Sequence, residues 1–337
     1  MAGVVGIVGA TGAVGHELLA VLRERRYPVE ALRCFASERS AGRRIEAPGW
    51  DGLVAEPLDA ARLGGCRVVF FSAGASVSRT WAPRAVEAGA TVIDNSSAFR
   101  MDPEVPLVVP EVNAHALRPG PGIIANPNCT TILLVVALAP IDRLAGLRRV
   151  VVASYQAASG AGARAMEELE AQTRAVLAGE PPAPPAALPQ PIAFNLFPHI
   201  DVFLPDEGWF TKEEQKVVHE TRKIMDRPGL PVVATCVRVP VRRAHAEAVF
   251  LELERDATPE AVRAALAAAP GVRVVDDPAA RRYPTPREAD GGDDVLVGRI
   301  RRDPSVERGV CLFLAGDQLR KGAALNAVQI AEALDRA

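Results

Sequence analysis

"VVGIVGATGAVGHELL" at residues 4–19 joins a short β-branched run to a helical pattern through a loop with glycines at positions 9, 12 and 15. A tight turn, a close backbone approach to a diphosphate and a close helix-to-strand contact each favour a residue without a side chain. The next helix points its free N–H groups at the phosphates. The spacing is G-x-x-G-x-x-G rather than G-x-G-x-x-G, and three glycines alone are a weak signal. The position of the loop directly after the first predicted strand is what argues against a structural turn with incidental glycines. The stretch predicts a dinucleotide-binding domain.

Strand-like and helix-like segments alternate through the rest of the first 125 residues. The expected strands cover residues 4–8, 31–37, 67–73 and 91–97, and the expected helices cover residues 13–25 and 79–90. Such alternation is typical of a parallel sheet covered on both faces. We therefore expect a Rossmann-type, doubly wound α/β domain over residues 1–128.

The sequence pattern changes near residue 150, where the predicted strands become longer. They cover residues 150–156, 232–241 and 247–254, and a proline-rich stretch, "PPAPPAALPQP", occupies residues 181–191. These features predict an α+β domain with a mixed sheet over residues 129–317 and an extended surface loop. Helical spacing of Ala324, Val328, Ala331 and Leu334 predicts a final helix. We expect the C-terminal segment 318–337 to pack back on the first domain.

Composition excludes several classes of protein. The chain has 337 residues, 49% of them hydrophobic and 24% charged, with a formal net charge of −2. This composition predicts a globular protein of about two domains without the basic surface that nucleic acids require. The N-terminus lacks a targeting pattern and no 18-residue apolar run occurs, so we expect a cytoplasmic protein without membrane contact. The five cysteines are scattered and never form a C-x-x-C pair, which argues against disulfides and a metal site.

The end of the second predicted strand indicates which dinucleotide is bound. It runs into "ASERSAG" at residues 36–42, which offers Ser37, Arg39 and Ser40 to the additional phosphate of NADP. Glu38 opposes this interpretation unless it points to solvent, since a carboxylate at this point favours NAD. A solvated polar turn is the alternative for the whole segment. We expect NADP.

Cys129 lies where the polar loop "NPNCTT" at residues 126–131 turns into the apolar run "ILLVVALA". A buried cysteine is usually core filling. Asparagines directly before it favour a helix start at the cysteine, and the positive end of a helix dipole stabilises a thiolate. A thiolate in a dinucleotide-binding protein suggests carbonyl chemistry through a thioester or thiohemiacetal.

Nine motifs follow one another in an order that resembles the aspartate-β-semialdehyde dehydrogenases, from Gly6 to about Ala331. They are "GATGAVG", "SAG" at 72–74, "DNSSAFR" at 94–100, "NPNCTT", "SYQAASGAG" at 154–162, "FNLFPHID", "VRVPVRRAHAE", "VGRIRRD" and "DQLRKGAALNA". The resemblance implies NADPH-dependent reductive dephosphorylation of β-aspartyl phosphate to the semialdehyde, in lysine, methionine and threonine biosynthesis. It also implies that the second domain is catalytic and forms a homodimer or homotetramer.

The resemblance also implies roles for individual side chains. Cys129 would be the acylated nucleophile, Gln156 would position the acyl intermediate, and His245 would be the acid/base. Arg100 and Lys216 would bind phosphate, Arg238 the α-carboxylate and Glu213 the amino group of the substrate. The predicted cofactor-binding residues are Gly9, Thr11, Gly12, Ala13, Val14, Gly15, Ser37, Arg39, Ser40, Ser72, Gly74, Asn95, Ser159, Gly160 and Gln318. Gln318 departs from the asparagine that is frequent at its position in the family.

Several alternatives stay open. Arg238 and His245 are seven residues apart and would face opposite sides of a continuous strand, so a shared pocket requires a break near Pro240. Glu213 and Lys216 could belong to a solvated helix face, and Arg100 could form a surface ion pair. Three other functions compete: an N-acetyl-γ-glutamyl-phosphate reductase, whose cysteine usually follows N-P-G, an aldehyde dehydrogenase acting without phosphate, and a catalytically silent dinucleotide-binding regulator.

Overall fold

The structure, a computed structural model, describes residues 2–336 and divides into two compact units. The first unit runs to Asn128 and resumes at Gly322, and the second comprises Cys129–Lys321. Residues 318–321, which the sequence analysis groups with the first domain, fall in the second unit. They are held there in part by Asp317 and Gln318, whose side chains bond to Arg243 and Ala244.

The first unit contains a six-stranded sheet in the order β3-β2-β1-β4-β5-β6. All its neighbouring strands are parallel. The strands are β1 Gly3–Val8, β2 Val29–Ala36, β3 Ala55–Pro57, β4 Cys66–Phe71, β5 Thr91–Asp94 and β6 Gly122–Ala125. The order reverses between β1 and β4, which places the glycine loop at the switch point where such sheets bind ligands. The predicted doubly wound fold is confirmed.

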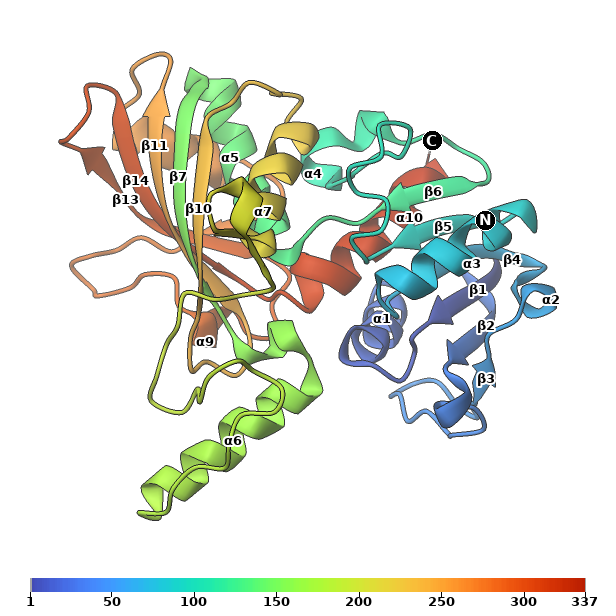
Figure 1. Ribbon diagram of the computed structural model, residues 1–337. Helices are drawn as coiled ribbons and strands as arrows, with labels where there is room; N and C mark the ends of the chain where they lie inside the picture. Colours follow the sequence, from blue (N-terminus) through green and yellow to red (C-terminus); the bar gives the residue numbers. More distant parts are fainter. Residues whose placement is uncertain (1, 337) are drawn as a thin grey trace. The chain divides into compact units, whose positions relative to one another are not determined.

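Helices cover both faces of this parallel sheet (Figure 1). They are α1 Ala13–Glu24, α2 Ala60–Leu63, α3 Ala75–Glu87, α4 Pro110–Asn113 and α10 Leu325–Arg336. Leu18 of α1 and Val328 of α10 share one apolar cluster with Ile7 of β1. Ala82 of α3 belongs to a second cluster with Val69 of β4. The last helix therefore packs on the same face of the sheet as α1.

The second unit contains a mixed sheet in the order β10-β7-β11-β14-β13-β12. The outer pairs β10/β7 and β12/β13 are parallel, and the inner pairs are antiparallel. The strands are β7 Leu147–Gln156, β10 Val232–Arg238, β11 His245–Leu253, β12 Val272–Val274, β13 Val295–Asp303 and β14 Gly309–Gly316; a separate pair is β8 Phe203–Leu204 and β9 Phe210–Thr211. The predicted mixed sheet is confirmed.

Five α-helices accompany this sheet in the second unit: α5 Cys129–Ala145, α6 Ala163–Leu177, α7 Lys212–Ile224, α8 Pro259–Ala267 and α9 Pro286–Ala289. Every residue of α5 from Thr130 to Ile141 is buried. A helix that is apolar on all sides must lie inside a core, which explains the apolar run of residues 132–139 after Cys129. The predicted helix that begins at this cysteine is confirmed.

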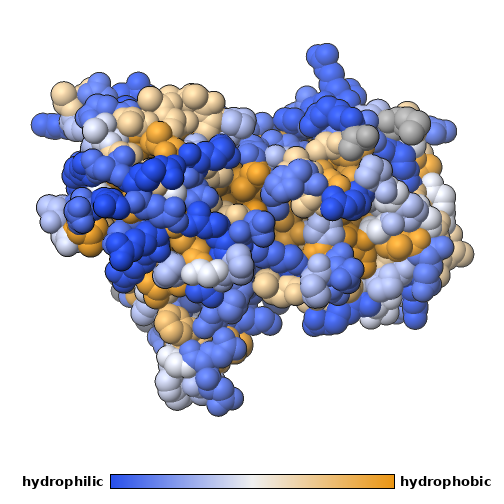
Figure 2. All heavy atoms as spheres, turned by 90° about the horizontal axis from the view of Figure 1, so that it is seen from above, coloured by the Kyte–Doolittle hydropathy of each residue, from blue (hydrophilic) through white to orange (hydrophobic). Residues whose placement is uncertain are grey.

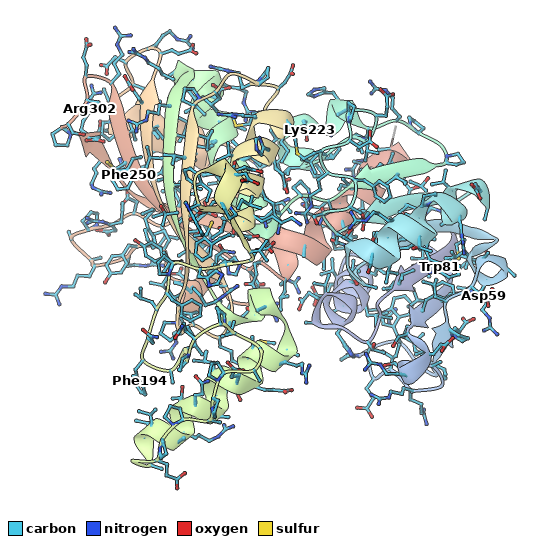
Figure 3. All side chains as sticks on the ribbon, in the orientation of Figure 1. Asp59, Trp81, Phe194, Lys223, Phe250 and Arg302 are labelled. Carbon is cyan, nitrogen blue, oxygen red and sulfur yellow. The ribbon has the colours of Figure 1, made fainter. Side chains whose placement is uncertain are left out.

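Residues 181–191 form neither helix nor strand, as the prolines predict. Phe194 follows this stretch and is 67% exposed (Figure 3). On the face that Figure 2 shows, clusters of hydrophobic residues lie between hydrophilic ones. Within residues 2–336, no helix combines the length and apolar character that crossing a membrane requires.

Candidate active site

The glycine loop after β1 is packed too tightly for side chains. Gly9 has φ +89°, and a Cβ on it would lie 2.9 Å from the carbonyl of Ser72. A Cβ on Gly15 would lie 2.4 Å from the oxygen of Gly9. Both contacts are closer than carbon atoms tolerate, so a left-handed turn and a close helix start both require glycine here.

A cavity of about 420 Å³ opens beside this loop in the first unit. Its lining includes five predicted cofactor-binding residues: Gly9, Thr11, Gly12, Ser37 and Ser72. Leu58, Val77 and Trp81 also line it, and Trp81 comes from α3 (Figure 3). Sequence reasoning missed this apolar group, which suits the flat ring of a nucleotide base. A glycine loop at the mouth of such a cavity fits a dinucleotide.

Other predicted cofactor-binding residues of this unit lie around the cavity's elements. Ala13 and Val14 begin α1, Gly74 directly precedes α3, and Arg39 and Ser40 belong to the short turn after β2. The cavity lining includes Glu38 rather than Arg39. Glu38, the residue that opposes NADP, therefore lines the cavity in this structure.

Arg100 is buried within the first unit rather than placed in a surface ion pair. Its Nε donates to the Asn126 carbonyl at 3.0 Å, and its Nη2 donates to the Asn95 carbonyl at 2.8 Å. The Asn95 side chain donates to the carbonyl of Phe71 and accepts from the Asn126 amide. These bonds fix the guanidinium to the backbone at the carboxyl ends of β5 and β6.

In the second unit, three predicted residues lie side by side across the sheet. Arg238 on β10 pairs with Gln156 on β7, and the β7/β11 register places His245 beside Gln156 on the other side. β10 ends at Arg238 and β11 begins at His245, so the expected break near Pro240 is present. Because the chain leaves the sheet between them, both side chains face the same side. We call Arg238, Gln156 and His245 the front row.

Cys129 begins α5, which packs against β7, β11 and β14. Its side chain is partly exposed, whereas the other four cysteines are buried. Burial lowers the pKa of Arg238, and the nearby Glu213 and Cys129 act in the opposite direction. The thiol is therefore close enough to the front row to interact electrostatically with its guanidinium.

His245 is fully buried, and its Nδ1 accepts a hydrogen bond from the Ala157 N–H at 3.0 Å. The neutral imidazole consequently carries its proton on Nε2. Burial first, and the Arg238 cation second, lower the pKa of His245 to about 3. The ring is thus neutral near pH 7 and presents Nε2–H, which has no hydrogen-bond partner among residues 2–336.

A polar chain leads from the front row to α7. Gln156 Nε2 donates to Glu213 Oε1 at 3.0 Å, and Lys216 Nζ donates to Glu213 Oε2 at 3.1 Å. Lys216 also pairs with Asp201 at 2.7 Å, a partner that sequence reasoning missed. Burial acts to lower the pKa of Lys216, but the two carboxylates outweigh it and raise the pKa. A solvated helix face is excluded, because Glu213 is only 6% exposed.

The Arg238 guanidinium has a nitrogen without a hydrogen-bond partner among residues 2–336. Its Nη1 donates to the carbonyl of Ala157, whereas its buried Nε has no hydrogen-bond partner among residues 2–336. An orphaned guanidinium nitrogen that is buried carries a desolvation cost. A bound carboxylate would satisfy it, since a carboxylate matches the planar fork of arginine.

The Gln318 side chain is hydrogen-bonded to segments next to the front row. Its Oε1 accepts from the Ala244 N–H at 2.8 Å, and its Nε2 contacts the hydroxyl of Ser159. The longer amide that departs from the family pattern thus makes two hydrogen bonds within the second unit. Across residues 2–336, no group of three or more histidine, cysteine or acidic side chains is arranged to hold a metal ion.

Gly160 is a sensitive position, because a Cβ on it would lie 3.1 Å from His245 Nε2 and Arg238 Nη1. We expect Gly160→Ala to lower kcat/KM about 10-fold by displacing these side chains, as small misplacements of reacting groups do. Steady-state kinetics with a thermal unfolding curve check this. Gly229→Ala is the matched control, since its Cβ would meet nothing within 4 Å. Equal effects from both variants would contradict the prediction.

Family models and a curated relative both match this chain to semialdehyde dehydrogenases. Residues 4–119 match the model of the semialdehyde dehydrogenase NAD binding domain, and residues 138–321 match that of the semialdehyde dehydrogenase dimerisation domain. An aspartate-semialdehyde dehydrogenase of a Synechocystis strain is 53% identical, over 98% of this chain and 96% of the relative.

Solved structures agree with this match. The crystal structure of aspartate semialdehyde dehydrogenase II from Vibrio cholerae, complexed with ASA, superimposes with a TM-score of 0.93 at 44% identity, covering 100% of this chain and 99% of that one. The Candida albicans enzyme with NADP superimposes with a TM-score of 0.76 at 25% identity, covering 99% of each chain.

Proposed function

This chain belongs to the aspartate-semialdehyde dehydrogenase family, and from that membership we propose NADPH-dependent reductive dephosphorylation of β-aspartyl phosphate to aspartate semialdehyde through a cysteine thioester. The observation that carries the proposal is Cys129 at the start of a buried helix, beside the front row. Relatives named for this activity and one solved with ASA support the substrate class. The reaction would belong to lysine, methionine and threonine biosynthesis in the cytoplasm.

The chemistry begins when the Cys129 thiolate attacks the acyl carbon of the substrate. The bond from that carbon to the phosphate oxygen breaks, and inorganic phosphate leaves and takes up one proton from water. The cofactor, when bound, supplies a hydride to the resulting thioester carbon. The carbon–sulfur bond then breaks, which releases the aldehyde and restores the thiolate.

His245 and the backbone would stabilise the oxygen at each tetrahedral stage. As the acid/base group of the proposal, His245 directs the Nε2 proton of its neutral ring at that oxygen. The N–H groups of the first turn of α5, at the positive end of the helix dipole, would supply further donors. Gln156 holds the acyl group beside them.

Substrate recognition follows from the charges of aspartyl phosphate. We assign the α-carboxylate to Arg238, whose orphaned Nε offers a second point of contact, and the amino group to Glu213. Lys216 and Arg100 are assigned to the phosphate. The neighbouring carboxylates keep Lys216 protonated, so it can balance the charge of an anion.

We propose NADP as the cofactor, although Glu38 lines the cavity. Ser37 at the same edge and Arg39 in the adjacent turn offer a hydroxyl and a cation to the additional phosphate. Removing the opposing charge should therefore help NADP: we expect Glu38→Gln to raise kcat/KM for NADP roughly 3- to 10-fold, as one surface charge contact near a bound anion does. Initial rates with NADP and NAD test this, and a wild-type preference for NAD would contradict the assignment.

We further propose that the chain forms a homodimer or homotetramer, because its second unit matches a dimerisation domain. Light scattering across a concentration series distinguishes these states from a monomer. A monomer at working concentrations would contradict this part of the proposal.

The activity itself is tested in the oxidative direction, by reduction of NADP with aspartate semialdehyde in the presence and absence of phosphate. We expect turnover only when phosphate is present. N-acetylglutamate semialdehyde serves as the competing substrate, and a preference for it would assign the chain to the related reductase. Phosphate-independent turnover would indicate an ordinary aldehyde dehydrogenase. Cofactor binding without any turnover would indicate a regulator.

A further inference from the structure

Lys216 on α7 is shared between two carboxylates that differ in how firmly they are held. Glu213 belongs to the same helix, and its side chain is only 7% exposed. One of its oxygens accepts from Gln156 and the other from Lys216. The second carboxylate, that of Asp201, lies 2.7 Å from the ammonium group, and its side chain is 31% exposed. Of the two, only Asp201 can turn to water without leaving a charge buried.

The segment that carries Asp201 is anchored beside the front row. The Phe197 N–H donates to the Arg238 carbonyl at 3.1 Å, and the Arg238 N–H donates to the Phe197 carbonyl at 2.9 Å. On the other side of Asp201, the Val202 carbonyl accepts from the Lys212 N–H at 2.8 Å, at the start of α7. Asp201 therefore lies on a segment tied both to Arg238, where the substrate carboxylate is assigned, and to the helix of Lys216.

A phosphate that binds Lys216 has to compete with Asp201. An ammonium group has three N–H donors, and two of those of Lys216 are bonded to Asp201 and Glu213. Its single positive charge already faces two negative charges within hydrogen-bonding distance. A phosphate dianion at the third donor would be repelled by both carboxylates. Turning Asp201 to water would weaken that repulsion and release a second N–H for the phosphate.

We propose that Asp201 is a positioning residue that acts through Lys216 as a tethered competitor of phosphate, and that it thereby sets the affinity of the protein for this anion. Its carboxylate returns to the ammonium group as phosphate departs, which favours release of the phosphate that the proposed reaction produces. A monoanion would compete less well than a dianion, because its charge only equals that of the carboxylate it displaces. The inference rests on the proposed function for its kinetic consequence, whereas competition at Lys216 is measurable by binding alone.

The backbone at Asp201 determines which variants test this proposal cleanly. Its φ of +66° lies in the left-handed region, which asparagine and glycine adopt more readily than other residues. Asp201→Asn keeps the shape and an acceptor oxygen but removes the charge, and Asp201→Gly removes the whole side chain. Both variants therefore suit the turn as it stands.

In the oxidative assay we expect both Asp201 variants to lower KM for phosphate about 3- to 10-fold, as removal of one partly exposed charge beside an anion does. The kcat should stay within about threefold of the wild type, because the thiol and the front row are unchanged. In the reductive direction, inhibition by added phosphate should become tighter by a similar factor. A purely structural role would instead lower kcat and the unfolding temperature together.

Asp256→Asn is the matched control, because it makes the same substitution in an exposed ion pair. Asp256 pairs with Arg302 at 2.6 Å, and it follows the end of β11 that is opposite to His245 (Figure 3). This variant should leave KM for phosphate unchanged. An equal change in Asp256→Asn would reduce the effect to one of net charge and overturn the proposal. A higher KM in Asp201→Asn, or an unchanged KM in both Asp201 variants, would overturn it as well.

Calorimetric titration with inorganic phosphate keeps the inference testable without turnover. We expect phosphate to bind Asp201→Asn about 3- to 10-fold more tightly than the wild type, and Lys216→Met more weakly. If the wild type turns over no semialdehyde, the proposed function fails while these affinities still test the competition. Equal affinities in the wild type and Asp201→Asn, or an affinity that Lys216→Met leaves unchanged, would overturn the proposal.

Discussion

Replacing Cys129 with alanine is expected to lower phosphate-dependent kcat by ~10⁴-fold or more, the largest effect that we predict. Loss of the proposed nucleophile would remove the route to an acyl-enzyme, and comparable losses accompany removal of nucleophiles in other enzymes. The small side chain fits the first turn of α5, so the fold should persist. Initial rates with enzyme at high concentration measure the remaining activity.

Two controls make this result specific. NADP binding, followed by quenching of tryptophan fluorescence, should be unchanged in Cys129→Ala, because Trp81 lines a cavity of the first unit and Cys129 belongs to the second. Cys311→Ala removes a buried thiol from β14 and should retain activity. Activity within tenfold of the wild type in Cys129→Ala would contradict the covalent mechanism.

Replacing Arg238 with lysine is expected to lower kcat/KM roughly 100-fold, the second-largest effect. Charge-assisted hydrogen bonds contribute about 1.5–3 kcal/mol each, and an ammonium group cannot reproduce the planar fork. Nη1 would also no longer hold the Ala157 carbonyl. Most of the loss in kcat/KM should come from a higher KM for the semialdehyde, since the substrate α-carboxylate would be bound both before and during the reaction.

Arg242→Lys is the matched control for this variant, because Arg242 lies nearby in sequence but forms an exposed ion pair with Glu170. It should behave as the wild type. A second readout is the titration of His245 by NMR. Its pKa should rise in Arg238→Met, since the cation that helps to lower it is gone. An unchanged KM in Arg238→Lys would contradict the assignment of the carboxylate.

The sequence predicts the fold where periodicity and glycine placement leave few choices. The loop from Gly9 to Gly15 permits only a tight strand-to-helix turn, and the asparagines before Cys129 favour a buried helix over the apolar run 132–139. Boundaries are less well determined. Helix α3 begins at Ala75, one turn before the expected start, because Gly74 at φ +92° ends the loop earlier than the sequence indicates.

The candidate site is predicted less completely, because strand register cannot be read from one sequence. Only the pairing of β7 with β10 and β11 places Gln156 between Arg238 and His245. Asp201 is 15 residues from Lys216, in a loop with φ +66°, so no local pattern joins them. Trp81 requires the direction of α3 before it can be assigned to the cavity.

The central claim is that Cys129 becomes covalently acylated, and trapping that intermediate tests it most directly. Wild-type protein is mixed with aspartyl phosphate without NADPH, quenched in acid and analysed by peptide mass spectrometry. We predict an aspartyl adduct on the peptide that contains Cys129, removed by hydroxylamine and absent from Cys129→Ala. Phosphate release without any adduct, or an adduct on another residue, would contradict the mechanism.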